Sequence, residues 1–183
     1  MRIAVVTSNP HKAAEVAAYF AGVAEVEHVR MDIPEYRDNE VANIAREKAR
    51  YAFEHLGRPC IVDDTAFSID HLNGFPGPYA AYVLETIGIA GILRLMEGVE
   101  DRSAHFETAI GYADAGGEIH IFSGVVDGEV TAAPRGAEGF GYDPIFAVGE
   151  RTFAEIPITE KSAVSHRGRA LAAFRAWLGD QYP

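Results

Sequence analysis

Near the start of the chain lies Ile3-Ala4-Val5-Val6-Thr7-Ser8-Asn9-Pro10-His11-Lys12, and an alanine-rich segment follows it as far as Phe20. The apolar run predicts a buried strand, and the segment after Asn9 predicts a helix that Asn9 caps and Pro10 begins. A strand that leads directly into a helix is typical of α/β folds. The helix N-terminus offers free backbone N–H groups and the positive end of the helix dipole, which favour a bound anion such as phosphate. Because the turn has no P-loop glycines, a purely structural junction is the simpler interpretation of this stretch taken alone.

Lys12 gives one reason to consider a ligand at this junction. If Asn9 caps the helix, Lys12 lies in the first turn, where the helix dipole opposes a cation. A compensating anion is therefore expected, and either Glu15 or a bound ligand can supply it.

The length and composition of the chain limit the classes of function. The chain has 183 residues and a formal net charge of -11, with no low-complexity linker or internal repeat, so a single domain is expected over residues 1–183. The acidic charge argues against a protein that follows a nucleic-acid polymer, which needs a basic surface. The single cysteine, Cys60, excludes an intrachain disulfide and is expected to be buried, as in a reducing cytosol. The most apolar region, residues 87–96, is interrupted by Arg94 and is too short to span a bilayer, so a cytoplasmic protein with no membrane partner is expected.

The rest of the chain alternates between strand and helix patterns, which supports an α/β fold. The predicted strands cover residues 24–30, 59–63 and 103–131, the last with hairpin turns at Ala115-Gly116-Gly117 and Asp127-Gly128. The predicted helical segments cover residues 39–55, 79–97 and 159–179, and a stiff loop rich in glycine and proline, residues 74–78, precedes the second of them. The cap of the last helix is left open between Thr159, Ser162 and Ser165.

Two cations lie on helix faces that are otherwise apolar. Lys48 belongs to the stripe Val41, Ile44, Ala45, Lys48 and Ala52, and Arg167 belongs to the stripe Val164, Arg167, Leu171, Phe174 and Leu178. Both cations are expected to point inward, unless they lie at the edge of the stripe and extend to solvent. Two inward cations in an acidic chain indicate a buried anion.

Two adjacent carboxylates, Asp63 and Asp64, follow an apolar run and are expected at the C-terminal end of a buried strand. Ligands of α/β sheets usually bind at this edge. Because side chains alternate along a strand, only one of the two is expected to face a given cleft. Such a carboxylate can hold Mg²⁺ or orient a water molecule for attack, although a turn or cap aspartate gives the same pattern. Glu35 offers a further carboxylate from a loop.

The segment Gly139-Phe140-Gly141-Tyr142-Asp143-Pro144 places two aromatic residues and an aspartate in one loop. The rings can stack on a purine, although an aromatic pair is more often part of a core. The proline is expected to hold Asp143 extended, where its carboxylate can accept hydrogen bonds from ring N–H groups. Lys161 and Ser165-His166-Arg167 add a dense set of donors for phosphate or carbonyl oxygens.

Short motifs occur in order along nearly the whole chain: Thr7 to Lys12 with Glu15, Pro34-Glu35, Lys48-Ala49-Arg50, Val62-Asp63-Asp64-Thr65, Gly74 to Tyr79, Ala133 to Gly136, Phe140 to Pro144, and Lys161 with Ser165-His166-Arg167. Each motif is weak alone, and in this order they resemble the inosine triphosphate pyrophosphatase family. The resemblance implies an elongated mixed sheet flanked by helices, with two lobes around a nucleotide cleft, and a homodimer. It also implies Mg²⁺-dependent hydrolysis of inosine or xanthosine triphosphate, or their deoxy forms, to the monophosphate and pyrophosphate.

The resemblance also assigns roles to residues at matching positions. It implies that Thr7 to Lys12 and Lys48 bind the triphosphate, that Glu35 and Asp64 hold the metal, and that Asp64 is the base for the attacking water. Lys12, Lys48, Lys161, Arg167 and Mg²⁺ would neutralise the phosphates. His166 and Arg167 are candidates to select a 6-oxo purine through donors that face O6. The residues expected to line the substrate site are Thr65, Phe140, Gly141, Tyr142, Asp143, Lys161, His166 and Arg167.

Two features depart from the family pattern. The acidic pair is Asp63-Asp64 where some relatives have Glu-Asp, which leaves the role of Asp63 open. Residues 43–47 lack the usual Glu-Asn-Ala spelling, so the position of Lys48 in the motif depends on Lys48-Ala49-Arg50 alone.

Three alternatives stay open at this point. A Maf-type nucleotide pyrophosphatase has a similar fold and chemistry but acts on other bases, and its motifs are not evident in this sequence. A nucleotide sensor would bind the ligand without hydrolysing it, and a structural module would bind no nucleotide. Asp64 distinguishes the enzyme from the sensor, because only the enzyme needs that carboxylate for turnover.

Overall fold

The computed structural model describes residues 2–181 and contains a mixed eight-stranded β-sheet. The strands follow the order β2-β1-β3-β5-β6-β7-β8, and the short strand β4 pairs with β3. β1 runs parallel to its neighbours β2 and β3, whereas the pairs from β3 to β8 are antiparallel. The strands are β1 (Arg2–Val6), β2 (Glu25–Val29), β3 (Cys60–Ile69), β4 (Pro76–Gly77), β5 (Ser103–Ala113), β6 (Ile119–Val130), β7 (Phe146–Val148) and β8 (Arg151–Thr152).

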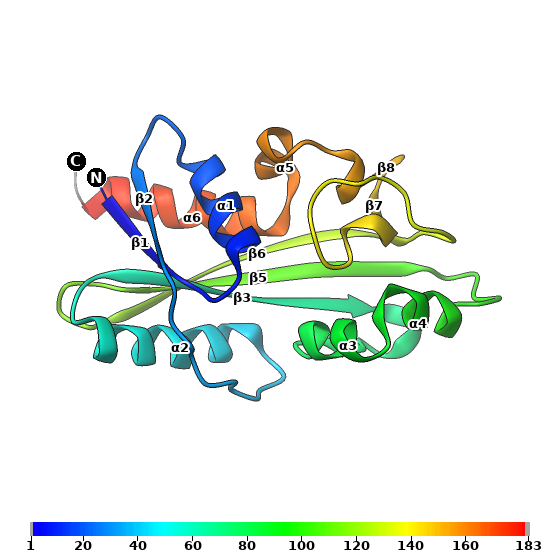
Figure 1. Ribbon diagram of the computed structural model, residues 1–183, viewed down its shortest axis with the longest axis horizontal. Coiled ribbons are helices and arrows are strands. Elements are labelled where there is room, and N and C mark those ends of the chain that lie inside the picture. The colour runs from blue at the N-terminus through cyan, green and yellow to red at the C-terminus, as the bar shows by residue number, and fades with distance from the viewer. Residues whose placement is uncertain (1, 182–183) are drawn as a thin grey trace.

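Helices cover both faces of the sheet (Figure 1). The helix α2 (Val41–Leu56) packs on β3 and β5 from one face, and α6 (His166–Gln181) packs on β5 and β6 from the other. The shorter helices are α1 (Pro10–Tyr19), α3 (Ala80–Thr86), α4 (Gly88–Leu95) and α5 (Ile158–Val164), with 3-10 turns η1 (Asp70–Leu72), η2 (Asp143–Ile145) and η3 (Phe153–Glu155). This arrangement confirms the predicted α/β class with an elongated mixed sheet flanked by helices. Among the described residues, no helix is both long enough and apolar enough to cross a membrane.

Glycines let the two long helices approach the strands closely. A Cβ atom at Gly111 of β5 would lie 2.6 Å from a backbone oxygen of α2, and one at Gly124 of β6 would lie 2.3 Å from a backbone oxygen of α6. A larger residue at either position would push the helix away from the sheet. Cys60, at the start of β3, is buried as predicted, and burial raises the pKa of its thiol to about 11.

Two predictions about the strands are wrong. β3 continues to Ile69, so Asp63 and Asp64 lie in the middle of a strand and not at its end. The reason is that β3 pairs with β5 without interruption over its whole length, which keeps the polar residues extended. Asp127-Gly128 belongs to β6 and is not a turn, because Gly128 allows a close approach: a Cβ atom there would lie 2.3 Å from the backbone oxygen of Ala147. The other predicted turn, residues 115–117, does connect β5 to β6.

The last predicted helix, residues 159–179, is divided at Ser165. The backbone of Ser165 is extended, and its Oγ accepts a hydrogen bond from the backbone N of Gly168 at 3.0 Å. Ser165 therefore caps α6, whereas Thr159 and Ser162 lie inside α5. Because of this break, Val164 leaves the predicted inward stripe and is exposed, while the other members of the stripe are buried. The helical segment at 79–97 is likewise two helices, which meet at Gly88, where φ is 64°.

The site lies where β1 ends. β1 stops at Val6, while β3 beside it continues to Ile69. On this side β3 pairs with β1 at Ile61 and with β4 at residues 67–68. Between these points, the edge of β3 at residues 62–66 has no strand partner on this side among the described residues. The acidic pair lies on this open edge.

Candidate functional site

The open edge of β3 forms one wall of a cleft of about 430 Å³. The other walls come from the turn between β1 and α1, from α2 and α3, and from the start of α6. Pro10 and His11 do not line the cleft, although they belong to the first turn of α1 beside it. The cleft brings together the other predicted site residues, which are Thr7, Ser8, Asn9, Lys12, Glu35, Lys48, Asp64, Thr65, Phe140, Gly141, Tyr142, Asp143, Lys161, His166 and Arg167.

Asn9 caps α1 as predicted, because its Oδ1 accepts a hydrogen bond from the backbone N of His11 at 2.9 Å. Lys12 lies in the first turn, and the anion that compensates its charge is Asp63 rather than Glu15. The Nζ of Lys12 lies 2.9 Å from Oδ1 of Asp63 and donates a hydrogen bond of 3.3 Å to the backbone O of the same residue. The N-terminus of α1 is thus fastened to the middle of β3.

Asp63 holds a second cation as well. Its Oδ2 accepts a hydrogen bond of 2.6 Å from Nε of Arg167. Burial alone would raise the pKa of this carboxyl, but the charges of Arg167 and Lys12 and their hydrogen bonds outweigh burial and hold its pKa well below the ordinary range. Asp63 is therefore an ionised brace between α1 and α6.

Asp64 points to the opposite side of the strand, toward α2. Its Oδ1 accepts a hydrogen bond of 2.7 Å from Nζ of Lys48, and the same Nζ lies 3.6 Å from Oε2 of Glu35. Lys48 is therefore directed inward as predicted. The expectation that only one residue of the acidic pair faces the cleft is wrong, because the cleft continues around the open edge of β3 and both Asp63 and Asp64 line it.

The two carboxylates beside Lys48 differ in exposure. The side chain of Glu35 is 87 % exposed on its loop, whereas that of Asp64 is 10 % exposed. Burial raises the pKa of Asp64 above its ordinary value, although Lys12 and Lys48 act against this shift. Burial disfavours the charged form of Lys48 and acts to lower its pKa. The attraction of Asp64 and Glu35 outweighs burial, so the pKa of Lys48 is raised.

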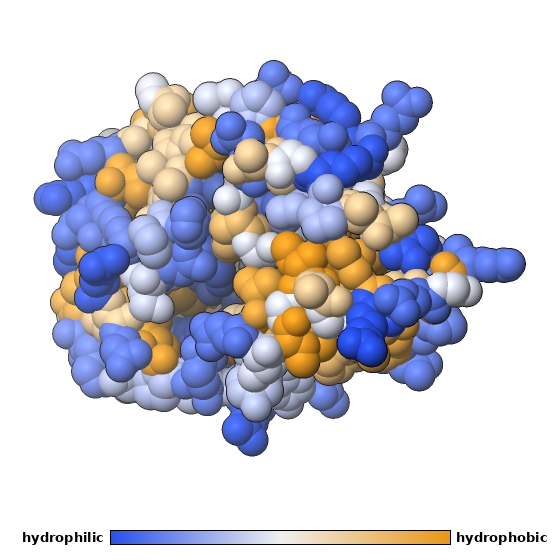
Figure 2. All heavy atoms as spheres, turned by 45° about the vertical axis from the view of Figure 1, so that its right-hand side comes forward, coloured by the Kyte–Doolittle hydropathy of each residue, from blue (hydrophilic) through white to orange (hydrophobic). Residues whose placement is uncertain are grey.

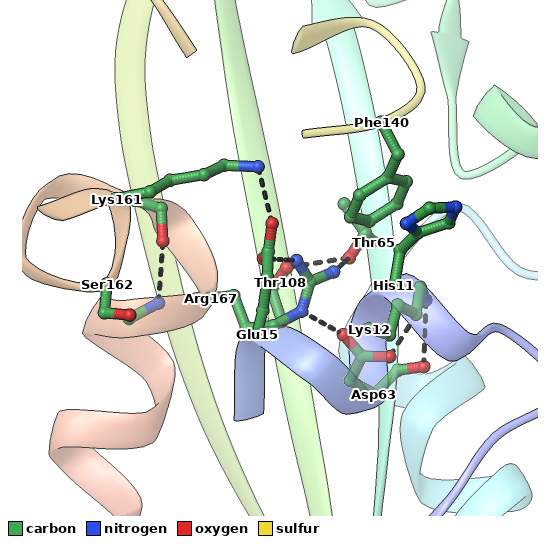
Figure 3. A network of polar contacts seen from close by, with 12 residues as sticks. His11, Lys12, Glu15, Asp63, Thr65, Thr108, Phe140, Lys161, Ser162 and Arg167 are labelled. Carbon is green, nitrogen blue, oxygen red and sulfur yellow. Dashed lines mark hydrogen bonds and ion pairs between the residues drawn. The ribbon is translucent and has the colours of Figure 1, made fainter. Parts of the chain in front are cut away.

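A buried network of ion pairs joins α1, α5 and α6 (Figure 3). Glu15 accepts a hydrogen bond of 2.6 Å from Nζ of Lys161 through Oε1, and one from Nη1 of Arg167 through Oε2. The Nζ of Lys161 also donates to Oδ2 of Asp143 at 2.6 Å. Both cations are 2 % exposed. The buried anion predicted beside Arg167 is therefore supplied by the protein itself, through Glu15 and Asp63.

The charges of this network shift the pKa values of its members. Burial acts to raise the pKa of Glu15, but Arg167 and Lys161 outweigh it, so the net shift is downward. Burial raises the pKa of Asp143, since the attraction of Lys161 is too weak to cancel it. Burial disfavours the charged form of Arg167 and acts to lower its pKa. The carboxylates of Asp63 and Glu15 outweigh burial, so the pKa of Arg167 is raised. The network is balanced in charge, with Glu15, Asp63 and Asp143 facing Lys12, Lys161 and Arg167.

His166 is the first residue of α6 and is 3 % exposed. Its ring stacks on Phe106, with centroids 4.5 Å apart and planes at 11°. Burial, together with the charges of Arg167 and Lys161, holds the pKa of His166 well below its ordinary value, so the imidazole is neutral. Its Nδ1 is buried and has no hydrogen-bond partner among the described residues. Since buried polar atoms are nearly always paired, this nitrogen is a group available to a ligand in the cleft.

Both aromatic residues of the loop before η2 line the cleft, but the ring of Tyr142 is packed into the hydrophobic core. Tyr142 is buried, with its ring on Phe67 and its hydroxyl donating to the backbone O of Ala80 at 2.8 Å. Phe140 stays half-buried. The prediction that Asp143 is extended is wrong, because its Oδ2 accepts a hydrogen bond from the backbone N of Phe140 at 2.8 Å and the residue begins η2. Of the aromatic pair, only Phe140 can therefore present a ring face to a base.

The donor chemistry around Lys48 fits Mg²⁺. This ion prefers oxygen ligands and is usually held by one or two carboxylates together with water and substrate phosphates. Asp64 and Glu35 both lie within 4 Å of the same ammonium group, so their oxygens already converge on one cation. Glu35 belongs to a loop without regular structure, so its carboxylate is free to adjust toward an ion.

From the sequence, Glu15 is a candidate partner for Lys12 and part of the first family motif, but it has no place among the predicted site residues. The structure makes it the anion shared by Lys161 and Arg167. Helical periodicity gave no signal for it, because Glu15 lies about 200° around α1 from the buried Ala13, and its own burial comes from the distant α5 and α6.

The chain is similar to known proteins along nearly its whole length. Residues 3–177 match the model of the Ham1 family. The sequence is 45 % identical over 181 residues to the dITP/XTP pyrophosphatase of Thermococcus kodakarensis, with 97 % of each chain covered. It is 46 % identical over 182 residues to the protein of the same name from Methanopyrus kandleri, with 97 % of this chain and 96 % of the relative covered. The solved structure of a Ham1 protein from Coxiella burnetii matches with a TM-score of 0.84 at 31 % identity, covering 98 % of this chain and 99 % of the other.

Proposed function

The chain belongs to the Ham1 family, and from this premise we propose that it is a Mg²⁺-dependent pyrophosphatase of nonstandard purine nucleoside triphosphates. The reaction converts inosine, deoxyinosine or xanthosine triphosphate and water to the monophosphate and pyrophosphate. The family predicted from the sequence motifs is confirmed, because relatives named dITP/XTP pyrophosphatase match over nearly the whole chain. The names of these relatives support hydrolysis of a nucleoside triphosphate as the activity. The preferred base and the requirement for Mg²⁺ are additional parts of our proposal.

One observation carries the proposal. The cleft places a buried carboxylate, Asp64, in the same space as Lys12, Lys48 and the N-terminus of α1. Phosphoryl transfer needs charge neutralisation and positioning more than covalent chemistry, so carboxylate, cations and backbone N–H groups are the parts it requires.

Asp64 is our candidate for the base that takes a proton from the attacking water. A general base works best when its pKa is close to the working pH, and burial shifts the pKa of Asp64 in that direction. The hydrogen bond from Lys48 stabilises the ionised form that can accept the proton. Asp64 and Glu35 are also the residues that would hold Mg²⁺, which when bound neutralises phosphate charge and orients the phosphate oxygens.

The phosphate end of the cleft is built around α1. The positive end of the α1 dipole, with Lys12 in its first turn, favours the triphosphate anion. We assign Lys161 and Arg167 a mainly indirect part, because their N–H groups already serve carboxylates. They contribute positive potential and hold the walls of the cleft in place.

Base selection is assigned to His166. When its buried Nδ1 carries a proton, it can donate a hydrogen bond to the O6 carbonyl of a 6-oxo purine. A 6-amino purine presents a donor instead, which would leave a buried donor unpaired at a cost of about 1–3 kcal/mol. We therefore expect discrimination of about 5- to 150-fold from this contact alone.

The experiment is a panel of pyrophosphate-release rates with Mg²⁺ on inosine, xanthosine, guanosine, adenosine and pyrimidine triphosphates. We expect the first two to be preferred, and Asp64→Asn to abolish release while nucleotide still binds. Asp127→Asn, an exposed aspartate on β6, is the matched control and should keep the wild-type rates. Turnover that survives in Asp64→Asn would refute the base, and equal rates on all substrates would refute the selectivity. Binding without any turnover by the wild-type chain would favour a sensor.

The selectivity can be tested separately with His166→Phe. This variant keeps a ring against Phe106 and removes the nitrogen. The ratio of inosine to adenosine triphosphate turnover should fall toward one, and an unchanged ratio would exclude His166 as the selecting group.

A homodimer is the partner that we propose for this chain. The part of the molecule that carries α3 and α4 exposes several large apolar side chains. Figure 2, in which this part comes forward, shows hydrophobic residues gathered on its surface. Exposed apolar patches of this kind often mark contacts between proteins. The residues are Phe75, Tyr79, Tyr82, Ile87 and Leu95. Light scattering should give a dimer for the wild-type chain and a monomer for Tyr82→Asp; a wild-type monomer at micromolar concentration would contradict it.

A further inference from the structure

His11 stands beside the cleft without lining it. Its ring lies on the ring of Phe140, with centroids 5.2 Å apart and planes at 16° (Figure 3). The side chain is exposed, and within residues 2–181 its ring takes part in no hydrogen bond or ion pair. Stacking on Phe140 is therefore the contact that places this ring.

The opposite face of Phe140 is covered by cations of the buried network. The Nζ of Lys161 lies 5.3 Å and Cζ of Arg167 lies 5.7 Å from the ring centroid. In Figure 3 the phenyl ring stands between these two cations and His11. Because both cations are tied to buried carboxylates, this face cannot be uncovered without breaking ion pairs. A flat ligand can reach Phe140 only on the face that His11 now covers.

Phe140 is the fixed member of the pair and His11 is the movable one. The backbone N of Phe140 donates to the buried carboxylate of Asp143, which fixes the position of the loop. The ring of His11 is exposed on the first turn of α1 and needs only side-chain rotation to leave.

We infer that the purine base takes the place of His11 on Phe140, so that His11 competes with the base for one ring face. This inference rests on the proposed function, because it requires a purine ligand in the cleft. It places His11 at the base end of the site rather than among the groups that bind phosphate. Every ligand that stacks on Phe140 must first separate the two rings, and His11 therefore weakens the apparent affinity for the nucleotide.

The size of the effect follows from the contact that is broken. An aromatic pair contributes about 0.5–1.5 kcal/mol beyond its buried area, which corresponds to about a two- to tenfold change in affinity. His11→Ala removes the competing ring and should tighten binding by that factor. If His11 instead contacted phosphate, or closed over the outer face of the base, His11→Ala would weaken binding of the nucleotide.

The test measures the dissociation constant of inosine monophosphate by calorimetry in the wild-type chain and in His11→Ala. The matched control is His55→Ala, which removes another exposed histidine that stacks on an aromatic ring, Tyr51, at 3.9 Å on α2. We expect two- to tenfold tighter binding in His11→Ala and no change in His55→Ala. The same comparison with inosine, which has no phosphate, should give the same factor.

A second measurement follows the ring of His11 itself by NMR. Its proton shifts should carry the ring-current effect of Phe140 in the free protein and lose it in Phe140→Leu. Saturation with inosine monophosphate should move the wild-type shifts toward the Phe140→Leu values.

Each outcome has one meaning. Weaker or unchanged binding in His11→Ala would overturn the inference, and so would His11 shifts that keep the ring-current effect in the saturated complex. If the wild-type chain releases pyrophosphate from inosine triphosphate while His11→Ala gives no gain in affinity, the inference fails alone. If the wild-type chain neither binds inosine monophosphate nor hydrolyses the triphosphate, the proposed function fails and the inference is rejected with it.

Discussion

Glu15→Gln is the substitution that tests the buried network most sharply. The glutamine keeps the shape of the side chain but removes the charge shared by Lys161 and Arg167. At 2.6 Å and an effective dielectric constant of about 20, the contact with Lys161 alone amounts to about 6 kcal/mol of Coulomb energy. Desolvation of the buried carboxylate offsets several kcal/mol, and breaking a buried pair from one side typically costs about 3–5 kcal/mol. We therefore expect the free energy of unfolding to fall by about 3–5 kcal/mol.

The assay is urea unfolding at neutral pH, with Glu47→Gln as the matched control. Glu47 pairs with Arg50 on the surface of α2, so the same substitution there should cost less than about 1 kcal/mol. The loss in Glu15→Gln should also depend on pH. The pKa of Glu15 is lowered from 4.5 in the folded chain, so its contribution is present above that pH and is lost as the pH falls through the folded value. A loss no larger than that of Glu47→Gln, or one that does not shrink in acid, would refute the account of the network.

Lys12→Ala should raise the KM for inosine triphosphate several-fold; an unchanged KM would mean that Lys12 serves only Asp63. Lys48→Met removes a charge that lowers the pKa of Asp64, so that pKa should rise further and the acid limb of the profile of kcat/KM against pH should move to higher pH. An acid limb that stays in place would exclude Asp64 as the titrating base. Gly124→Ala places a Cβ atom 2.3 Å from the backbone of α6, and thermal or urea unfolding should report a loss of about 1–3 kcal/mol. A loss below about 0.5 kcal/mol would show that α6 adjusts freely.

Local signals in the sequence predicted the parts of the fold that depend on local chemistry. The cap of α1 at Asn9 was predictable because a side-chain oxygen there satisfies a free N–H group two residues ahead. The inward direction of Lys48 and Arg167 followed from helical periodicity, which needs no knowledge of the partner. The order of the motifs identified the family.

The errors lie where distant segments decide the conformation. β3 continues past Asp63 because β5 pairs with it along its length, and no local pattern announces that partner. Gly128 was predicted to be a turn residue, whereas it allows the close approach of Ala147 in β7, which lies 19 residues further along the chain. The role of Glu15 depends on α5 and α6, which follow it by more than half of the chain.

The most direct test of the central claim identifies the products formed from inosine triphosphate and Mg²⁺ by ³¹P NMR. The wild-type chain should yield inosine monophosphate and pyrophosphate in equal amounts, with no diphosphate intermediate, and Asp64→Asn should yield neither. Inosine diphosphate with orthophosphate as the products, or wild-type product formation by Asp64→Asn, would contradict the account.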